Sequence, residues 1–383
     1  MKISVGIGSA LVTASCMVAL VTPVHAQVEE IVVTARKKEE RLQEVPLAIS
    51  AFSAEELQRK GIDDLSDIAR LTAGVQFDTI FSPADTRVVI RGLSPTRGRP
   101  NVAFLQDGID ISSEAVASAG GSMLINPRLF DLERVEIVKG PQSALYGRTA
   151  FAGAINYVTK RPGDEFEGKV SLDVGGDGQQ ELAGGISGAV VDGVLNVGLN
   201  AAVWEHDGYY TNSVTGADIG GEEGFGVSLS ALFTPIETVS VFARMEYTDD
   251  EFGIFPWSQL PGNTQLPIPP AAIGTVISPG VPGLAISGYA GSVPDADQQV
   301  VRSSPDPNTG ADYPGSSREI FRTSVILDWD LASGATLSWL SSFADTTTAQ
   351  FEDNSRQGDV NTLAYFTLID YVTDRTTWSQ ELR

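Results

Sequence analysis

The strongest constraint on the fold is a set of segments in which every second residue is apolar. They occupy residues 195–204, 225–233, 239–247, 321–329 and 335–343, with Gly, Asp and Asn turns between them. A period of two predicts antiparallel strands with one apolar and one polar side. Strands of 9 to 12 residues with aromatic residues near their ends are typical of a transmembrane β-barrel. A secreted β-sandwich shows the same alternation, so periodicity alone leaves both open.

Charge divides the chain into two parts of different character. Residues 27–162 hold 17 Lys and Arg against 18 Asp and Glu, whereas residues 163–383 hold 8 against 31. The break coincides with the basic turn Lys160-Arg161-Pro162-Gly163, where we place the domain boundary. The formal net charge of −23 lacks the basic surface that phosphate backbones require, so we exclude nucleic acid as a partner.

The first 26 residues read as an export signal. A single Lys2 precedes a diluted apolar run, and small residues end at Ala26. Cleavage after Ala26 removes the only cysteine, Cys16, and one of two histidines, His25, which leaves no ingredients for Cys/His zinc sites or nucleophilic pairs. A membrane anchor is the alternative reading of this segment. Beyond it, no stretch approaches 18 consecutive apolar residues, so export predicts either a soluble protein or insertion as strands.

Residues 44–162 mix helix and strand signals and predict a small α+β domain. Ser53 and Glu56 form a capping box, and Gly61 is placed to stop the helix. A second short helix follows Asp63. Short β-type runs cover residues 87–91, 102–106, 134–138 and 154–159, with glycines near their ends.

Residues 250–318 interrupt the strands with 69 residues that hold 11 of the 20 prolines. A structureless connection of this length does not fit inside a compact domain, so we expect a long, Pro-rich external loop. Four aromatic residues could hold an aromatic or sugar-like substrate there, or pack the loop on itself: Phe252, Phe255, Trp257 and Tyr289.

Several ordered motifs resemble the TonB-dependent outer-membrane receptors. The segment RVEIVKGPQSALYGRTAFAGAINYVTKRP at residues 134–162 resembles the end of their plug domain. VIRGL from Val89 and VAFLQDGIDI from Val102 resemble the central plug strands and their turn at Asp107-Gly108. EEIVVTARKKEE at residues 29–40, followed by VPLAISAFSAEEL from Val45, resembles the TonB box and the opening of the plug. WSQELR from Trp378 resembles a barrel strand.

The resemblance implies an α+β plug domain followed by antiparallel transmembrane β-barrel strands. We expect a signal peptide at 1–26, a TonB box and flexible leader at 27–43, a plug at 44–162 and barrel strands at 163–383. The family implies 22 strands, which need on the order of 220 residues before any loop is counted. Only 221 residues follow Pro162, and the chain ends in Arg383 without the expected terminal aromatic strand. About eight strands can be placed, and eight alone leave no room for a plug. We therefore expect an incomplete barrel.

The segment Glu30-Ile31-Val32-Val33-Thr34-Ala35 is a short β-branched run before a charged stretch. Such a run can add as a strand to the edge of a partner's sheet, where backbone hydrogen bonds give the grip. The resemblance implies that TonB, with its inner-membrane energising partners, binds these six residues. The alternative is an ordinary first strand of the plug.

The activity that the resemblance implies is energised import of a scarce nutrient across the bacterial outer membrane, most commonly a ferric chelate. Outer-membrane lipid and a small-molecule substrate are the further implied partners. Charged residues of the plug are candidates for holding it against the barrel wall, or are solvated strand ends: Arg91, Arg134, Glu136, Lys139 and Arg148.

The sequence predicts neither a catalytic centre nor a resident cofactor or metal. Residues 306–312 space oxygen ligands as a calcium loop does, but Ser317 stands where its closing Glu would be. His206 reads as a strand-end residue. Two other functions stay open: a secreted β-rich protein that binds or cleaves carbohydrate with paired carboxylates, and an outer-membrane receptor that does not import.

Overall fold

The structure is a computed structural model. It describes residues 32–34, 37–38, 40–62, 65–79, 86–95, 100–113, 122–124, 126–128, 131–147, 149–256, 258–259, 264–267, 285–288, 300–301, 303–306, 308–353 and 368–383. The predicted signal segment 1–26 and residues Glu30, Ile31 and Ala35 of the predicted TonB box lie outside these ranges.

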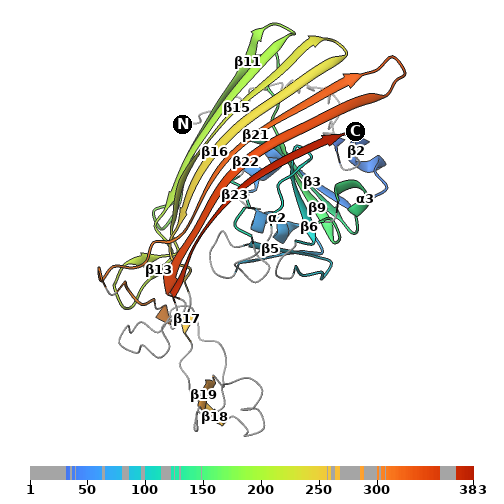
Figure 1. Ribbon diagram of the computed structural model, residues 1–383. Helices are drawn as coiled ribbons and strands as arrows, with labels where there is room; N and C mark the ends of the chain where they lie inside the picture. Colours follow the sequence, from blue (N-terminus) through green and yellow to red (C-terminus); the bar gives the residue numbers. More distant parts are fainter. Residues whose placement is uncertain are drawn as a thin grey trace, which may run out of the picture.

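The chain forms two bodies that lie against each other (Figure 1). A smaller mixed module, built from residues 32–159 and called here the N-terminal module, packs against one face of a curved sheet of eight long strands, called here the wall sheet. No helix in the described part of the chain is long and apolar enough to cross a membrane.

The N-terminal module contains a five-stranded sheet of order β3-β8-β9-β6-β7, in which β6 and β9 are parallel and the other pairs antiparallel. Two-stranded ladders β1-β2 and β4-β5 flank it. Its core joins α1 and α2 to the sheet through Leu57, Leu65, Ile68, Phe104 and Ile155. Its elements are β1 (Val32–Val33), β2 (Glu40–Arg41), η1 (Leu42–Glu44), β3 (Ile49–Ser53), α1 (Ala54–Arg59), α2 (Leu65–Leu71), β4 (Val75–Thr79), β5 (Thr86–Ile90), β6 (Val102–Gln106), β7 (Ile109–Asp110), β8 (Leu132–Lys139), α3 (Ser143–Tyr146) and β9 (Gly153–Thr159).

Local sequence signals place these elements. The Ser53 hydroxyl accepts a hydrogen bond from the Glu56 N–H at 3.2 Å, which is the predicted N-cap of α1. Asp107 and Gly108 connect β6 to β7 with φ of +52° and +79°, the two-residue turn that Asp-Gly favours in a hairpin. The four β-type runs predicted in this part of the chain correspond to β5, β6, β8 and β9.

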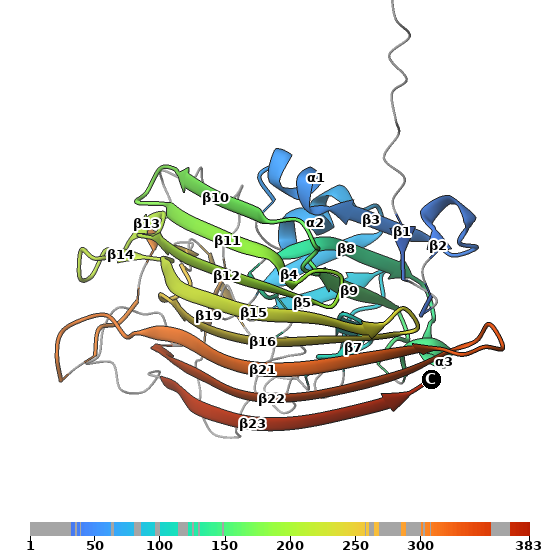
Figure 2. The same cartoon turned by 90° about the horizontal axis from the view of Figure 1, so that it is seen from above.

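The wall sheet has eight strands that pair antiparallel in chain order, as the sequence predicts. They are β10 (Glu167–Val174), β11 (Gln180–Val191), β12 (Leu195–His206), β15 (Glu222–Ile236), β16 (Val239–Phe252), β21 (Gly315–Asp330), β22 (Thr336–Asp353) and β23 (Leu368–Leu382). Within the described residues β10 and β23 do not pair, so the sheet is open, as Figure 2 shows.

The two ends of the wall sheet differ in their connections. Residues 192–194, 237–238 and 331–335 make short turns at one end. At the other end residues 207–221, 253–314 and 354–367 make longer loops, joined by the short connection 175–179. The predicted structureless loop contains two short ladders among its described residues, β17 (Ser258–Gln259) with β20 (Val300–Val301), and β18 (Thr264–Pro267) with β19 (Ala285–Gly288). A further ladder joins β13 (Tyr210–Thr211) to β14 (Asp218–Ile219).

The wall sheet is inverted relative to a soluble sandwich. Large apolar side chains are exposed on the face that points away from the N-terminal module, for example Leu172 at 68%, Val203 at 51% and Trp378 at 72%. Charged side chains such as Arg244 and Asp250 are buried on the face toward the module. An extended apolar outer surface over polar lumen-facing positions is the arrangement of a membrane barrel, and it argues against the sandwich.

Aromatic side chains mark a line across the outward face near the loop end. Phe225, Tyr247, Phe321, Phe343 and Trp378 come from five successive strands, with ring centroids 5.7 Å apart for Phe225 and Tyr247 and 4.7 Å apart for Phe343 and Trp378. From Phe225 to Trp378 the line shifts four residues along the strands while crossing four strand spacings. At about 3.3 Å per residue and 4.8 Å per strand, this slope is about 35°. A strand tilt of that size is typical of barrels.

Candidate functional site

The leader is seated on the edge of the N-terminal module. Val33 is completely buried and packs with Val45 and Val138, whereas its neighbour Val32 is 40% exposed. The pair of strands β1 and β2 brings Val32 opposite Arg41 and Val33 opposite Glu40. Side chains of a strand alternate between two sides, so one valine fixes the segment while the other stays accessible.

A buried carboxylate holds the next residue of the leader. The Thr34 backbone N–H donates to Glu136 Oε1 at 2.9 Å, and the Thr34 hydroxyl donates to the same oxygen at 3.1 Å. Arg134 donates from Nε to Glu136 Oε1 at 2.8 Å, and Asn156 donates to the Thr34 hydroxyl at 3.3 Å. Glu136 has no exposed surface, so these donors replace the water that its charge would otherwise bind.

The leader lies at the short-turn end of the wall sheet. Lys37 forms an ion pair with Glu381, which is near the last residue of β23, and Glu381 stands next to Leu382, the register partner of Trp339 in the first turns of β22. This contact ties the leader to the wall sheet as well as to the N-terminal module. The long loops lie at the opposite end.

A cluster of charges joins the N-terminal module to the middle of the wall sheet. Arg244 of β16 pairs with Asp131 of the module at 2.5 Å and with Glu246 of its own strand at 2.8 Å. Glu246 also pairs with Arg322 of β21 and accepts a hydrogen bond from Gln106 of β6 at 2.8 Å. Opposite charges compensate each other here, which makes the burial of all of them tolerable.

Two further arginines bridge the two bodies. Arg318 of β21 pairs with Asp250 at 2.5 Å and donates to the carbonyl oxygens of Met123 and Asn126 in the module, at 2.9 and 2.8 Å. Arg128 of the module reaches Glu181 of β11 at 2.6 Å and Glu222 of β15 at 2.9 Å, and its guanidinium lies over the Trp204 ring. Planar guanidinium groups suit such multiple acceptors.

An apolar contact completes the attachment. Ile109, which follows the Asp107-Gly108 turn, packs with Phe242, Ile326 and Leu340 of the wall sheet. Asp107 itself accepts hydrogen bonds from the Thr159 N–H and hydroxyl, both at 2.8 Å. Burial raises the pKa of Asp107 to about 6, and the bonds from Thr159 oppose this shift.

The charged residues predicted to contact the wall have other described partners. Arg134 pairs with Glu133 and Glu136, and Lys139 donates to Ser50 and the Ala73 carbonyl, all within the N-terminal module. Arg91 lies beside Gly140 of the same module. Arg148 lies outside the described residues. The bridging residues Gln106, Arg128 and Asp131 were missed because no local sequence pattern distinguishes them from surface polar residues.

Other sequence candidates show no convergent ligands. Asp312 turns both oxygens to Asn212 and Thr215, at 2.7 and 2.9 Å, instead of toward the predicted calcium loop. Asp306 accepts from Asn308 within its own turn, and the described residues contain no group of three or more acids, His or Cys that could hold a metal. Trp257 and Tyr289 lie outside the described residues. His206 ends β12 and contacts Tyr209, as a strand-end residue would.

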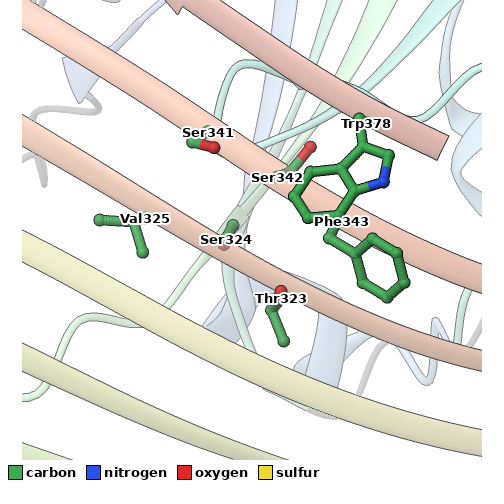
Figure 3. A pocket seen from close by; sticks show the side chains of 7 residues that line it. All are labelled: Thr323, Ser324, Val325, Ser341, Ser342, Phe343 and Trp378. Atoms are coloured by element: carbon green, nitrogen blue, oxygen red, sulfur yellow. The ribbon is translucent and has the colours of Figure 1, made fainter.

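A recess on the outward face belongs to the membrane side of the wall sheet. Figure 3 shows the rings of Phe343 and Trp378 beside Thr323, Val325 and Ser341, on three neighbouring strands. Because it faces away from the N-terminal module, this recess is separate from the contacts that join the two bodies.

Comparison with known proteins identifies the N-terminal module. Residues 41–154 match the family model of the TonB-dependent receptor plug domain. The vitamin B12 transporter BtuB of Vibrio vulnificus is 34% identical over 176 residues, which cover 44% of this chain and 28% of that protein. The pesticin receptor of Yersinia pestis is 28% identical over 191 residues, which cover 49% and 27%.

Solved structures share the fold of both bodies. The ferric yersiniabactin uptake receptor FyuA from Yersinia pestis superposes with a TM-score of 0.63 at 17% identity, covering 88% of this chain and 45% of that one. The ferripyoverdine receptor of Pseudomonas aeruginosa gives 0.66 at 16% identity, covering 92% and 41%. The chain thus spans less than half the length of these receptors. The predicted fold, a plug followed by about eight antiparallel barrel strands, is confirmed.

Proposed function

We propose that this chain, a TonB-dependent receptor by its plug domain and barrel strands, takes part in the energised import of a scarce small-molecule nutrient across the outer membrane. In this proposal TonB binds Glu30, Ile31, Val32, Val33, Thr34 and Ala35. The N-terminal module acts as the plug, and the outward apolar face of the wall sheet contacts lipid.

The observation that carries the proposal is the seat of the leader. A short strand with one exposed valine, Val32, lies at the short-turn end of the wall sheet, where periplasmic turns are found in outer-membrane barrels. It is attached to the plug through Thr34 and Glu136. A partner that pairs with this strand could therefore transmit a pull directly to β8, the strand that carries Glu136.

The charge cluster around Arg244 gives the same proposal a mechanical basis. The outer membrane holds no ATP, so the energy must arrive through the leader. A pull moves the plug only if its attachments to the wall can exchange partners. Ion pairs and hydrogen bonds rearrange over short distances, whereas interdigitated apolar packing does not.

The experiment compares Val32→Pro with Val32→Ala. Proline removes a backbone donor and weakens strand pairing, while alanine keeps the donor and shortens only the side chain. We expect Val32→Pro to abolish binding of the TonB C-terminal domain and uptake, and Val32→Ala to retain most of both. Equal behaviour of the two variants, or unchanged TonB binding by Val32→Pro, would remove the leader from this role.

For the cargo we propose a ferric chelate. The support is that two of the compared proteins are described by ferric yersiniabactin and ferripyoverdine, while the vitamin B12 transporters make cobalamin the main competitor. Growth of a strain that carries this receptor, on a panel of iron(III) chelates and on cyanocobalamin as the limiting nutrient, separates these cargoes.

A further inference from the structure

The N-terminal module is fastened unevenly to the wall sheet. On β16 and β21, inward side chains bind it through Arg244, Arg318 and Arg322, and positions such as Phe242 are 1% exposed. On β10 the inward Lys169 is exposed and makes one hydrogen bond to the module among the described residues, to Gln58 at 2.6 Å. The inner face of β10 and β11 is therefore only partly covered.

A cleft of about 710 Å³ lies on this less covered side. Its wall side consists of small residues of β10 and β11, among them Ser171, Ala183 and Gly185, and the register places Ser171 directly opposite Ala183. Its other side is formed by the module, including Ser53 and Arg134. Small side chains facing polar ones leave open space where the other strands have interlocked contacts.

The cleft also borders the leader. Val32, the exposed valine of β1, is one of its lining residues. Arg134 lines it too and lies two residues from Glu136, the acceptor for Thr34. Displacing the leader would therefore remove one boundary of the cleft and disturb a second, on β8, while leaving the arginine bridges to β16 and β21 untouched.

We propose that this cleft, between the N-terminal module and strands β10 to β12, is the route by which cargo passes the plug. The inference rests on the proposed import function and adds where the passage opens. The module stays attached to β16 and β21 as a hinge, and withdrawal of the leader widens the opposite side. Pockets of about 300–1,000 Å³ hold drug-sized ligands, so a modest widening suffices for a small polar solute or chelate.

The first test measures opening without any cargo. Cys16→Ser removes the only cysteine, so a single introduced thiol reports its own exposure. The reporters are Ala183→Cys in the cleft, with Ser187→Cys as a second position, and Thr348→Cys, which is 8% exposed on β22. Each is combined with Val33→Asp, which expels the leader because an unpaired charge cannot occupy the completely buried Val33 site.

We expect Val33→Asp to accelerate labelling of the purified chain by a bulky fluorescein maleimide about tenfold at Ala183→Cys and Ser187→Cys, because thiol labelling follows access. Labelling at Thr348→Cys should stay within about twofold. Equal acceleration at all three positions means that the whole module loosens, and acceleration at Thr348→Cys alone places the opening elsewhere. Either result overturns the proposal.

The second test staples each side of the module in cells with a short bismaleimide. Gln58→Cys with Lys169→Cys closes the cleft side, and Ser112→Cys with Arg375→Cys, whose parent residues share a 3.4 Å hydrogen bond, closes the opposite side. Uptake of cyanocobalamin or an iron(III) chelate should fall about tenfold with the first staple only, because only that staple blocks the gating motion. Block by both staples, or by the second alone, overturns the route.

The two tests separate the route from the function. If the unstapled receptor imports none of these probes, the proposed import function fails. The labelling experiment still decides whether the cleft opens on leader release, since it depends on neither TonB nor cargo.

Discussion

Thr34 and Glu136, 102 residues apart in the chain, share two hydrogen bonds that fix the leader on the N-terminal module. The pairing makes one buried carboxylate the acceptor for both the backbone and the side chain of Thr34, with Arg134 as its counter-ion. The grip on the leader thus depends on a charge that lies inside the module.

Glu136→Gln should loosen the leader and destabilise the module. The amide keeps one acceptor oxygen but loses the charge that holds Thr34 and neutralises Arg134. We expect a loss of about 2–4 kcal/mol in unfolding free energy, the scale for breaking a buried pair, and faster proteolysis within the leader. Urea denaturation and limited proteolysis measure these effects.

Glu133→Gln is the matched control because Glu133 pairs with the same arginine but its side chain is 49% exposed. Exposed pairs contribute less than about 1 kcal/mol, so this variant should resemble the parent. If both substitutions have the same effect, the burial of Glu136 is not what secures the leader.

Arg244→Met should detach the module from the middle of the wall sheet. Asp131 and Glu246 have side chains only 6% and 12% exposed, and both lose their partner on β16. Removing one member of a buried ionic cluster costs about 3–5 kcal/mol. Hydrogen exchange should rise in β6 and β8, while Arg87→Met, whose partner Asp78 is 62% exposed, should leave it unchanged.

Asp107 predicts a pH dependence of module stability. Because burial raises its pKa from 3.8 to about 6, the folded state binds a proton more tightly than the unfolded state. The contribution of this group to stability is therefore smallest above pH 6 and grows as the pH falls toward 4, by about 1–3 kcal/mol in total.

Asp107→Asn removes this ionisation and keeps a residue that tolerates the positive φ of the turn. The difference in unfolding free energy between parent and variant, measured from pH 7 to pH 4, isolates the group from all other titrations. A difference that stays constant over this range would show that Asp107 titrates normally.

Membrane contact of the wall sheet can be tested on a single strand. Leu229 lies in the middle of the outward apolar band of β15 and is 46% exposed, whereas Glu223 lies beyond the aromatic line on the same face. In a bilayer, Leu229→Arg should cost about 2–4 kcal/mol and Glu223→Arg about 0–1 kcal/mol. Folding titrations into lipid vesicles measure both, and equally mild effects would favour a soluble sheet.

Most of the architecture was predictable because it depends on local patterns. Ser53 and Glu56 specify the start of α1 within one turn, and Asp107-Gly108 specify a hairpin turn within two residues. Alternation along each wall strand fixes which side chains share a face. Short sequence windows contain all of this information.

The partners of the charged residues were not predictable in this way. Arg134, Glu136 and Lys139 stand out in the sequence, yet their described contacts lie inside the module and the leader. Gln106, Arg128 and Asp131 carry no comparable signal, yet they bridge to wall strands far along the chain.

The sequence alone determined the strands, the turns, the division into an α+β module and an acidic strand-rich part, and the resemblance to a receptor family, because each depends on residues that are neighbours in the chain. Only the tertiary structure decided which face of the wall sheet meets the module, where that contact is tight and where it leaves a cleft. Those properties depend on the register and packing of segments separated by 100 residues or more, and neither propensity nor periodicity specifies how two such surfaces meet.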